Sequence, residues 1–205
     1  MILDAALLTI PETECAQKLA DAGVRLLQYR NKRASARELF ESSKELVSLL
    51  APQKVSVVVN DRADVTALAG ANGVHVGQED LGVEEARQVA GPEKLVGVST
   101  HNLEQFQRAA ASSADYIAVG PIFATGTKSN LDPVVGTEFV RKVRLLTDKP
   151  IVAIGGITLE RAPEIIESGA DSVAVISDIL GAPKPGMRAR QYIDLLGVAN
   201  HTAAG

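Results

Sequence analysis

Cysteine is almost absent from this sequence, in which Cys15 is the only one. A single cysteine excludes an internal disulfide and a metal site built from several cysteines. The first twelve residues, MILDAALLTIPE, also lack the charged and then apolar pattern of a secretory leader. We therefore expect a cytoplasmic protein.

Aromatic residues and long apolar runs are scarce as well. Phe, Tyr and Trp make up 3% of the chain, which leaves few side chains that could stack on bases. No apolar run approaches the ~18 residues that span a bilayer. The 21 basic residues are spread along the chain and the formal net charge is -4, so no basic surface is indicated. We expect small-molecule partners, no nucleic acid and no membrane, and the sequence leaves a homo-oligomer open.

Aliphatic residues are abundant by contrast. The hydrophobic fraction of 46% over 205 residues fits one domain that spans residues 1–205. Short runs rich in Val, Ile, Leu and Ala recur along the chain, and most lack polar alternation, as parallel strands covered on both faces do. The eight runs are AALLTI, VRLLQYR, VSVVVN, GVHVG, LVGVST, YIAVG, PIVAIGG and SVAVIS. Helical patterns or helix start signals follow them at residues 12–21, 36–50, 63–70, 83–90, 103–113, 137–146, 159–168 and 187–196.

Eight strand–helix units decide between the two main parallel architectures. A doubly wound sheet usually has about five to seven strands, whereas eight such units close into a barrel. No glycine fingerprint of the G-x-G-x-x-G type follows the first run, so a dinucleotide crevice has no support. The sequence predicts an α/β fold, a single (β/α)8 TIM barrel, with residues 198–205 disordered.

Charged side chains follow the second run, at the end of the barrel where TIM-barrel enzymes place their functional residues. The motif QYRNK puts Gln28, Arg30 and Lys32 at alternate positions, so all three point to one side of an extended strand. One interpretation is that the basic side chains only solvate the strand end. An inward charge at a barrel mouth is costly without an anionic partner, so we favour an anionic ligand.

Acidic residues follow the next two runs. Asn60 and Asp61 come directly after VSVVV, and Asp80 follows the fourth run in HVGQEDL. Two carboxylates on neighbouring loops repel each other unless a cation lies between them, and such oxygen ligands suit Mg²⁺. Asp80 could equally cap the helix that begins near Gly82. His75 has no second His or Cys at metal spacing, and we interpret it as a packed or barrel-lining histidine.

Hydroxyl groups stand at the exit of the fifth run. Ser99 and Thr100 either donate hydrogen bonds to a ligand or cap the helix that begins near Leu103. Asn102 is the better candidate for that cap, because asparagine directly precedes the helical pattern.

The stretch after the sixth run, GPIFATGTKSN, is longer than a strand–helix connection needs. Its residues Thr125, Thr127 and Lys128 are typical of a loop that binds an anion, although a solvated loop has the same glycines and hydroxyls. Only the lysine, together with the basic pair at the second exit, favours the anion-binding interpretation.

Glycines and small residues follow the last two runs, in IGGIT and VISDIL. TIM barrels commonly bind a phosphate between backbone N–H groups at these two exits. Gly156 allows the backbone to approach an anion closely, and Ile176 and Ser177 can offer amides. Two anionic subsites are therefore predicted, one beside the acids and basic residues and one at the glycines.

The ordered set QYRNK, VNDRADV, HVGQEDL, GVSTH, GPIFATGTK and IGGIT resembles the thiamine phosphate synthase family, across residues 27–177. The resemblance implies a transferase that joins 4-amino-5-hydroxymethyl-2-methylpyrimidine diphosphate to a thiazole phosphate, with Mg²⁺ on the diphosphate and thiamine phosphate as product. Diphosphate departure from the pyrimidine carbon, through a pyrimidine cation, is the implied chemistry. The first strand, taken as ALLTIPE, lacks the Tyr and Asp often found at that exit in the family.

The same resemblance implies a role for each residue. The pyrimidine diphosphate would be bound by Gln28, Arg30, Lys32, Asn60, Ser99 and Lys128. The basic members of that set, Arg30, Lys32 and Lys128, would be catalytic because they neutralise charge on the departing diphosphate. The magnesium ligands would be Asp61 and Asp80. The thiazole phosphate would contact Thr125, Thr127, Gly156, Ile176 and Ser177.

Two alternatives have weaker support. A thiazole tautomerase-like relative would share the fold and the phosphate site, but such relatives tend to carry a histidine where this chain has Pro121. A non-catalytic regulatory barrel that binds thiamine precursors would not need a metal-assisted site for a leaving group. A diphosphate release assay with both substrates separates the three, because only the synthase releases diphosphate.

Overall fold

Eight parallel strands form one sheet in chain order in the computed structural model, which describes residues 1–126 and 132–202, with side chains up to residue 197. The strands are β1 (Ile2–Asp4), β2 (Leu26–Arg30), β3 (Ser56–Asn60), β4 (Gly73–Val76), β5 (Leu95–Thr100), β6 (Tyr116–Val119), β7 (Ile151–Ile154) and β8 (Ser172–Ala174). The N–H of Ile2 donates to the carbonyl of Val175 at 3.1 Å, just beyond β8. This bond joins the last strand to the first, and the predicted TIM barrel is confirmed.

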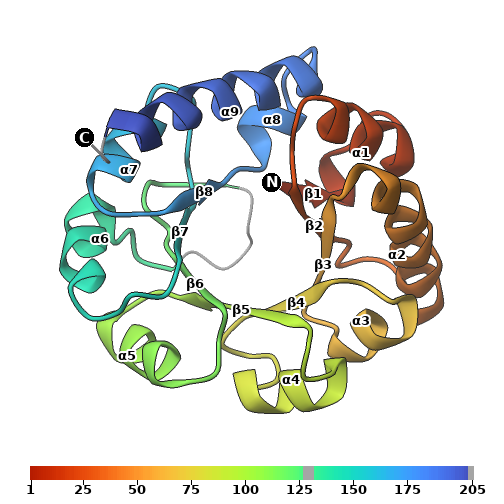
Figure 1. Cartoon of the computed structure of the whole chain (residues 1–205), viewed down its shortest axis with the longest axis horizontal. Coiled ribbons are helices and arrows are strands. Elements are labelled where there is room, and N and C mark those ends of the chain that lie inside the picture. The colour runs from red at the N-terminus through yellow and green to blue at the C-terminus, as the bar shows by residue number, and fades with distance from the viewer. Residues whose placement is uncertain (127–131, 203–205) are drawn as a thin grey trace.

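Helices surround the sheet as an outer ring (Figure 1). In the described residues they are α1 (Glu12–Asp21), α2 (Ala36–Leu50), α3 (Ala63–Ala69), α4 (Val83–Ala90), α5 (Leu103–Ala111), α6 (Gly136–Arg144), α7 (Ala162–Glu167), α8 (Ser177–Leu180) and α9 (Pro185–Thr202), with short 3-10 helices η1 (Ala5–Leu7) and η2 (Ala51–Gln53). Helix α9 contacts α1, α7 and α8 and so completes the ring (Figure 1). None of the helices described is long and apolar enough to cross a membrane.

Capping residues begin two of the helices, α2 and α5. Ser35 precedes α2 in a capping box, since its hydroxyl accepts from the Glu38 N–H while the Glu38 carboxylate accepts from the Ser35 N–H at 2.7 Å. Asn102 caps α5 through its side-chain oxygen, which accepts from the Gln105 N–H at 3.0 Å. The cap predicted at Asn102 is therefore confirmed.

The predicted first strand is wrong in its position. We expected it within AALLTI, but β1 covers Ile2–Asp4, in register with Gln28 to Arg30, and Ala5–Leu7 forms η1. The reason is local: the Asp4 carboxylate accepts from the Ala6 N–H at 3.0 Å and turns the chain out of the strand. An aspartate therefore does stand at the first exit, which corrects the expectation that this exit lacks one. At the other end of the sheet, β8 ends at Ala174 and Ser177 begins the unpredicted helix α8.

The two faces of the sheet differ in chemistry. Side chains such as Leu27, Tyr29, Val57 and Val59 belong to the large core between strands and helices. Inside the barrel lies a smaller apolar cluster of Ile2, Ala118 and Ile154. Several inward positions of β2 to β5 carry polar side chains instead, namely Gln28, Asn60, His75 and Ser99, whereas the inward Leu26 and Val58 are apolar. The polar side of the interior leads to the carboxyl ends of the strands.

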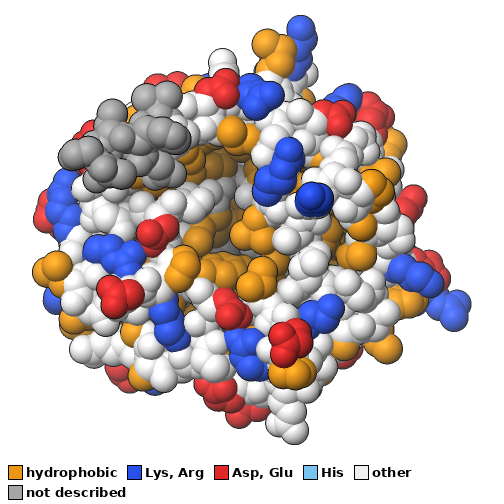
Figure 2. Space-filling view, in the orientation of Figure 1, with side chains coloured by type: hydrophobic (Ala, Val, Ile, Leu, Met, Phe, Trp, Pro, Cys, Tyr) orange, Lys and Arg blue, Asp and Glu red, His pale blue; other side chains and the backbone are white. Residues whose placement is uncertain are grey.

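A hollow lined by hydrophobic side chains opens at the centre of the ring in Figure 2. It corresponds to a cavity of about 480 Å³ at the amino ends of the strands, where Met1, Leu26, Tyr116 and Pro150 contribute to the lining. Residues 198–202 belong to helix α9, so the disorder predicted for residues 198–205 is wrong for this part. Residues 203–205 lie outside the described part, and for them the disorder stays a prediction.

Candidate active site

A polar cavity of about 410 Å³ lies at the carboxyl ends of the strands. It brings together side chains from β1 to β5 and the loops that follow them. The predicted site residues that line it are Gln28, Arg30, Lys32, Asn60, Asp61, Asp80 and Ser99. These residues are widely separated in the sequence, so the barrel closure places them in one site.

The basic side chains of this polar cavity already have acidic partners in the protein. Arg30 on β2 pairs with Asp4 at the end of β1, and Lys32 pairs with Asp61. Gln28 donates to the Asn60 side-chain oxygen at 2.7 Å, which orients the amide next to the basic pair. An inward charge was expected to need an anionic partner, and for Arg30 the buried Asp4 is such a partner. Asp4 was not predicted because the first strand was expected further along the chain.

Asp61 adopts a backbone conformation that side chains other than glycine rarely take, with φ of 65°. Its N–H donates to the His75 carbonyl on β4 at 2.7 Å, which holds the residue in that conformation. Burial raises the pKa of the Asp61 carboxyl, the hydrogen bond from Lys32 lowers it, and the neighbouring Asp80 raises it again. A strained and electrostatically disfavoured acid at a cavity wall is typical of a functional residue.

Asp80 lies close enough to interact with the Asp61 carboxyl, as the sequence predicts. One of its oxygens accepts from the Gly77 N–H at 2.7 Å, which ties the carboxylate back to the exit of β4. Helix α4 begins after Gly82 with no side-chain cap. The alternative in which Asp80 caps this helix is therefore wrong.

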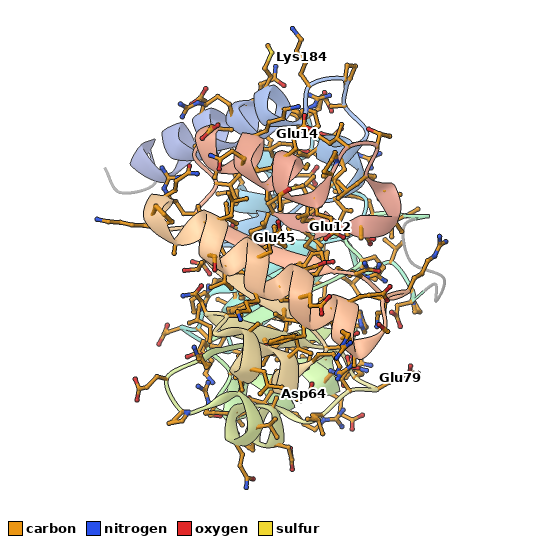
Figure 3. All side chains as sticks on the ribbon, turned by 90° about the vertical axis from the view of Figure 1, so that its right-hand side faces the viewer. Glu12, Glu14, Glu45, Asp64, Glu79 and Lys184 are labelled. Atoms are coloured by element: carbon orange, nitrogen blue, oxygen red, sulfur yellow. The ribbon has the colours of Figure 1, made fainter. Side chains whose placement is uncertain are left out.

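The charges of the polar cavity favour a bound cation. Among the described residues it is lined by two basic side chains, Arg30 and Lys32, and by four acidic ones, Asp61, Glu79, Asp80 and Asp132. Figure 3 labels Glu79 at one end of the barrel, whereas Glu14 and Glu45 lie on the outer helices α1 and α2. No cluster of three or more His, Cys, Asp or Glu that could hold a metal occurs in the described residues. Two carboxylates completed by ligand oxygens and water are the arrangement that suits Mg²⁺.

The hydroxyls at the end of β5 do not cap α5. The Ser99 oxygen lies 2.8 Å from Nε2 of the buried His75 and faces the polar cavity. The Thr100 hydroxyl donates to the Ala118 carbonyl at 2.9 Å and is fully buried. Of the two, only Ser99 is placed to meet a ligand, and the prediction of His75 as a barrel-lining histidine is confirmed.

A second, more apolar cavity of about 200 Å³ adjoins the first. Its lining includes the remaining predicted residues in the described part, Thr125, Gly156, Ile176 and Ser177. Gly156 has φ of 64°, and a Cβ there would overlap the carbonyl oxygen of Ala124, so only glycine fits. Thr127 and Lys128 lie outside the described residues.

The two cavities share a wall made by His101, Asp132, Ile154 and Ile176. His101 donates from Nδ1 to the Gly120 carbonyl at 2.6 Å, and its Nε2 lies 3.5 Å from the Asp132 carboxylate. Ligands in the two cavities would therefore meet across this wall.

Several residues of the site were not predicted. Gln78 and His101 line the polar cavity within two residues of the ends of β4 and β5, and Asp4, the partner of Arg30, is the last residue of β1. Their position at strand exits is a signal that could have indicated them. Gln78 donates to the Ser99 carbonyl at 2.7 Å and links two neighbouring exits. Asp132 lies in a long connection without a periodic pattern, and no signal in the sequence indicates it.

Known proteins share both the sequence and the fold of this chain. The family model described as thiamine monophosphate synthase matches residues 1–179. A thiamine-phosphate synthase from Koribacter versatilis is 54% identical over 184 residues, which cover 90% of this chain and 86% of the relative. One from Shouchella clausii is 41% identical over 169 residues, covering 82% of this chain and 81% of the relative.

A solved structure agrees with these relatives. The thiamine phosphate pyrophosphorylase from Pyrococcus furiosus superposes with a TM-score of 0.89 and 32% identity, over 97% of this chain and 95% of that one. The match of the family model over most of the length, together with these identities, shows that the chain belongs to the thiamine monophosphate synthase family.

Proposed function

We propose that this protein is a thiamine-phosphate synthase, which joins 4-amino-5-hydroxymethyl-2-methylpyrimidine diphosphate to a thiazole phosphate and releases diphosphate. The observation that carries the proposal is the pair of adjoining cavities, one rich in charged groups and one lined by Gly155, Gly156 and Ser177. Such a pair suits one substrate with a diphosphate and a second with a single phosphate. The named relatives agree with this activity, and neither the tautomerase nor the regulatory alternative is favoured.

The chemistry breaks one bond and forms another at the same carbon. The exocyclic carbon of the pyrimidine loses its bond to the diphosphate oxygen, and the electron pair leaves with the diphosphate. The resulting pyrimidine cation is captured by the thiazole nitrogen, which forms the new C–N bond. This nitrogen carries no proton, so the reaction needs no general base, and stabilisation of the departing diphosphate is the main task of the protein.

Positive groups carry out that task. Arg30 and Lys32 face the polar cavity and would bind diphosphate oxygens, while Gln28, Asn60 and Ser99 would position the pyrimidine part. Asp61 and Asp80 would hold Mg²⁺, which when bound neutralises charge that develops on the leaving group. The roles of Lys128 at the diphosphate and of Thr127 at the thiazole phosphate rest on the sequence resemblance, because both residues lie outside the described part.

The second cavity would bind the thiazole phosphate. Thr125, Gly156, Ile176 and Ser177 line it, and the positive φ of Gly156 turns the backbone where no side chain obstructs an anion. Its largely apolar remainder suits a thiazole ring. Because the wall is shared, the nitrogen of a bound thiazole would face the carbon that loses the diphosphate.

A release assay tests the proposed function. Purified protein with Mg²⁺ and both substrates should release one diphosphate for each thiamine phosphate formed. Neither substrate alone should give product, and chelation of divalent cations should stop the reaction until Mg²⁺ is restored. Absence of diphosphate release with both substrates and Mg²⁺ would contradict the proposal.

A further inference from the structure

Three polar side chains form a continuous hydrogen-bonded chain through the interior of the barrel. The Tyr116 hydroxyl lies 3.0 Å from His75 Nδ1, and His75 Nε2 lies 2.8 Å from the Ser99 hydroxyl. Tyr116 lines the cavity at the amino ends of the strands, whereas Ser99 lines the polar cavity at the carboxyl ends. The hydrogen-bonded chain therefore connects the lining of one cavity to the lining of the other, and His75 lines both.

The sheet is built to allow this chain. Register pairs His75 with Gly97 and Gly97 with Tyr116, so the three occupy one row across β4, β5 and β6. A Cβ at Gly97 would overlap the Tyr116 ring, so the glycine makes room for the tyrosine to lean across β5. The rings of His75 and Tyr116 stack with centroids 5.5 Å apart. Ser99 stands two residues beyond Gly97, on the same face and nearer the site.

A polar row at this depth is unusual for the fold. Barrel interiors are normally filled by branched apolar side chains, and each buried polar group must be paired to avoid a cost. Ser99 and His75 are buried, at 5% and 6% exposure. Apolar residues would fill the same space, so packing alone does not require this row.

Hydrogen-bond directions follow from the partners. Charge in the barrel interior is costly, so we take His75 as neutral, with one nitrogen that donates and one that accepts. Burial raises the pKa of Tyr116, so its hydroxyl keeps its proton. If the tyrosine donates to Nδ1, then Nε2 carries the proton of His75 and donates to Ser99. The Ser99 oxygen is then occupied as an acceptor, and its own proton points to the polar cavity.

We propose that His75 is a positioning residue that Tyr116 holds in the Nε2-protonated form, so that Ser99 acts as a hydrogen-bond donor to an acceptor atom of the pyrimidine diphosphate. The inference rests on the proposed function and adds to it a specificity device. An acceptor on the substrate, either a ring nitrogen or a diphosphate oxygen, satisfies Ser99, whereas a donor at that point would leave both groups unpaired.

Nitrogen-15 NMR of the histidine side chains tests the protonation state directly. The spectrum of His75→Gln identifies the His75 signals by their loss. The free wild-type protein at neutral pH should show a protonated Nε2 and an unprotonated Nδ1 for His75. Tyr116→Phe removes the donor to Nδ1 and should shift the signals towards the other form. The matched control Tyr29→Phe, which removes a hydroxyl bonded to Glu12, should leave them unchanged.

Kinetics then test the role of His75 in binding. Gln at position 75 retains an N–H near the Nε2 position, whereas Leu does not. His75→Leu should raise the KM for the pyrimidine diphosphate about tenfold with little change in kcat, and His75→Gln should stay within about threefold of wild type. Thermal melting identifies variants that fail to fold, and Ser99→Ala should reproduce the KM effect without touching the histidine.

Several outcomes overturn the inference. A protonated Nδ1 in active wild-type protein contradicts the positioning role alone and leaves the proposed function intact. Equal KM values for folded His75→Leu, His75→Gln and wild type also contradict it. Wild-type protein that releases no diphosphate contradicts the proposed function, and the role in substrate binding with it.

Discussion

Arg30 and Lys32 have carboxylate partners before any ligand binds. A basic residue held by a neighbouring acid keeps a fixed orientation, which lowers the entropy lost when an anion replaces or joins that acid. Asp4 is almost completely buried, so it serves to orient Arg30 and is itself inaccessible to a ligand. Asp61 is shared between Lys32 and the proposed metal. At the scale of single residues, the site is therefore prearranged by ion pairs.

Removal of Arg30 should separate its two roles. Arg30→Ala should lower kcat/KM by about 100-fold, because a group that stabilises the departing diphosphate is lost. It should also lower the free energy of unfolding by about 3 kcal/mol, because it leaves the buried Asp4 carboxylate without its cationic partner. Steady-state kinetics and urea unfolding measure the two effects.

A double variant provides the control for this prediction. Asp4→Asn combined with Arg30→Ala removes both charges, so it should recover much of the lost stability while activity stays low. The exposed helix variant Arg108→Ala, which breaks only a surface pair with Glu104, should change neither. Full activity in folded Arg30→Ala would show that the side chain has no part in diphosphate departure.

Cys15 illustrates a buried residue outside the site. It lies in α1 with 1% of its surface exposed, and burial raises the pKa of its thiol. Because the thiolate is the reactive form, native protein should react with a thiol reagent at least about tenfold more slowly at pH 8 than unfolded protein does. A colorimetric thiol assay with and without denaturant measures the difference, and equal rates would show that α1 does not protect the residue.

The helices act as separate supports for the strand exits. Helix α2 follows the exit that carries Lys32, and its capping box at Ser35 and Glu38 is complete. A well-capped start fixes where the helix begins and hence how the preceding loop leaves β2. At the scale of elements, local capping therefore contributes to the position of site residues.

Loss of this cap should lower the stability of the protein and leave its catalytic activity unchanged. Ser35→Ala should lower the free energy of unfolding by about 1 kcal/mol, because the Glu38 N–H loses its acceptor. Ser48→Ala in the last turn of the same helix, at an exposed position, should leave the free energy of unfolding unchanged or slightly raised. Chemical denaturation of both variants makes the comparison. Equal stability of the two would show that the cap contributes little.

The whole barrel brings its charges together at one end. The polar cavity collects more acidic than basic side chains among the described residues, although its proposed ligand is itself an anion. This excess of acidic side chains weakens the binding of a diphosphate when no metal is present, and a bound metal ion would reverse the effect. Binding of Mg²⁺ and binding of the diphosphate should therefore strengthen each other.

Linkage should appear in thermal unfolding. Mg²⁺ and the pyrimidine diphosphate together, at about 100 times their dissociation constant, should stabilise the protein by about 2.7 kcal/mol. For a chain of this size that corresponds to a rise in Tm of roughly 5–10 °C. Differential scanning calorimetry measures it, with Asp80→Asn as the variant that should lose most of the shift. If the diphosphate raised Tm by the same amount in the presence of a chelator, its binding would not require a metal.

Repeating patterns made most of the fold predictable. Seven strands lie within the predicted runs, and helices such as α1, α2 and α4 have the predicted bounds, because apolar periodicity and caps act over a few residues. The first strand was misplaced because the apolar run AALLTI, which follows Ile2–Asp4, is longer and gives the stronger strand pattern. Helix α8 was not predicted because its four residues are too few to show helical periodicity.

The candidate site likewise has a part that the sequence predicts and a part that it does not. Strand exits can be read from the sequence, so Gln28, Arg30, Asp61 and Asp80 are predicted from the sequence alone, and the structure places them around one cavity. The sequence by itself determined the order of the strands, the residues at each exit and the resemblance of the motifs. Only the tertiary structure decided which side chains pair across exits, such as Arg30 with Asp4 and His75 with Ser99. Which side chains pair depends on the register of the strands and on closure of the barrel. Both are set by the chain as a whole, so no short stretch of sequence indicates the pairs.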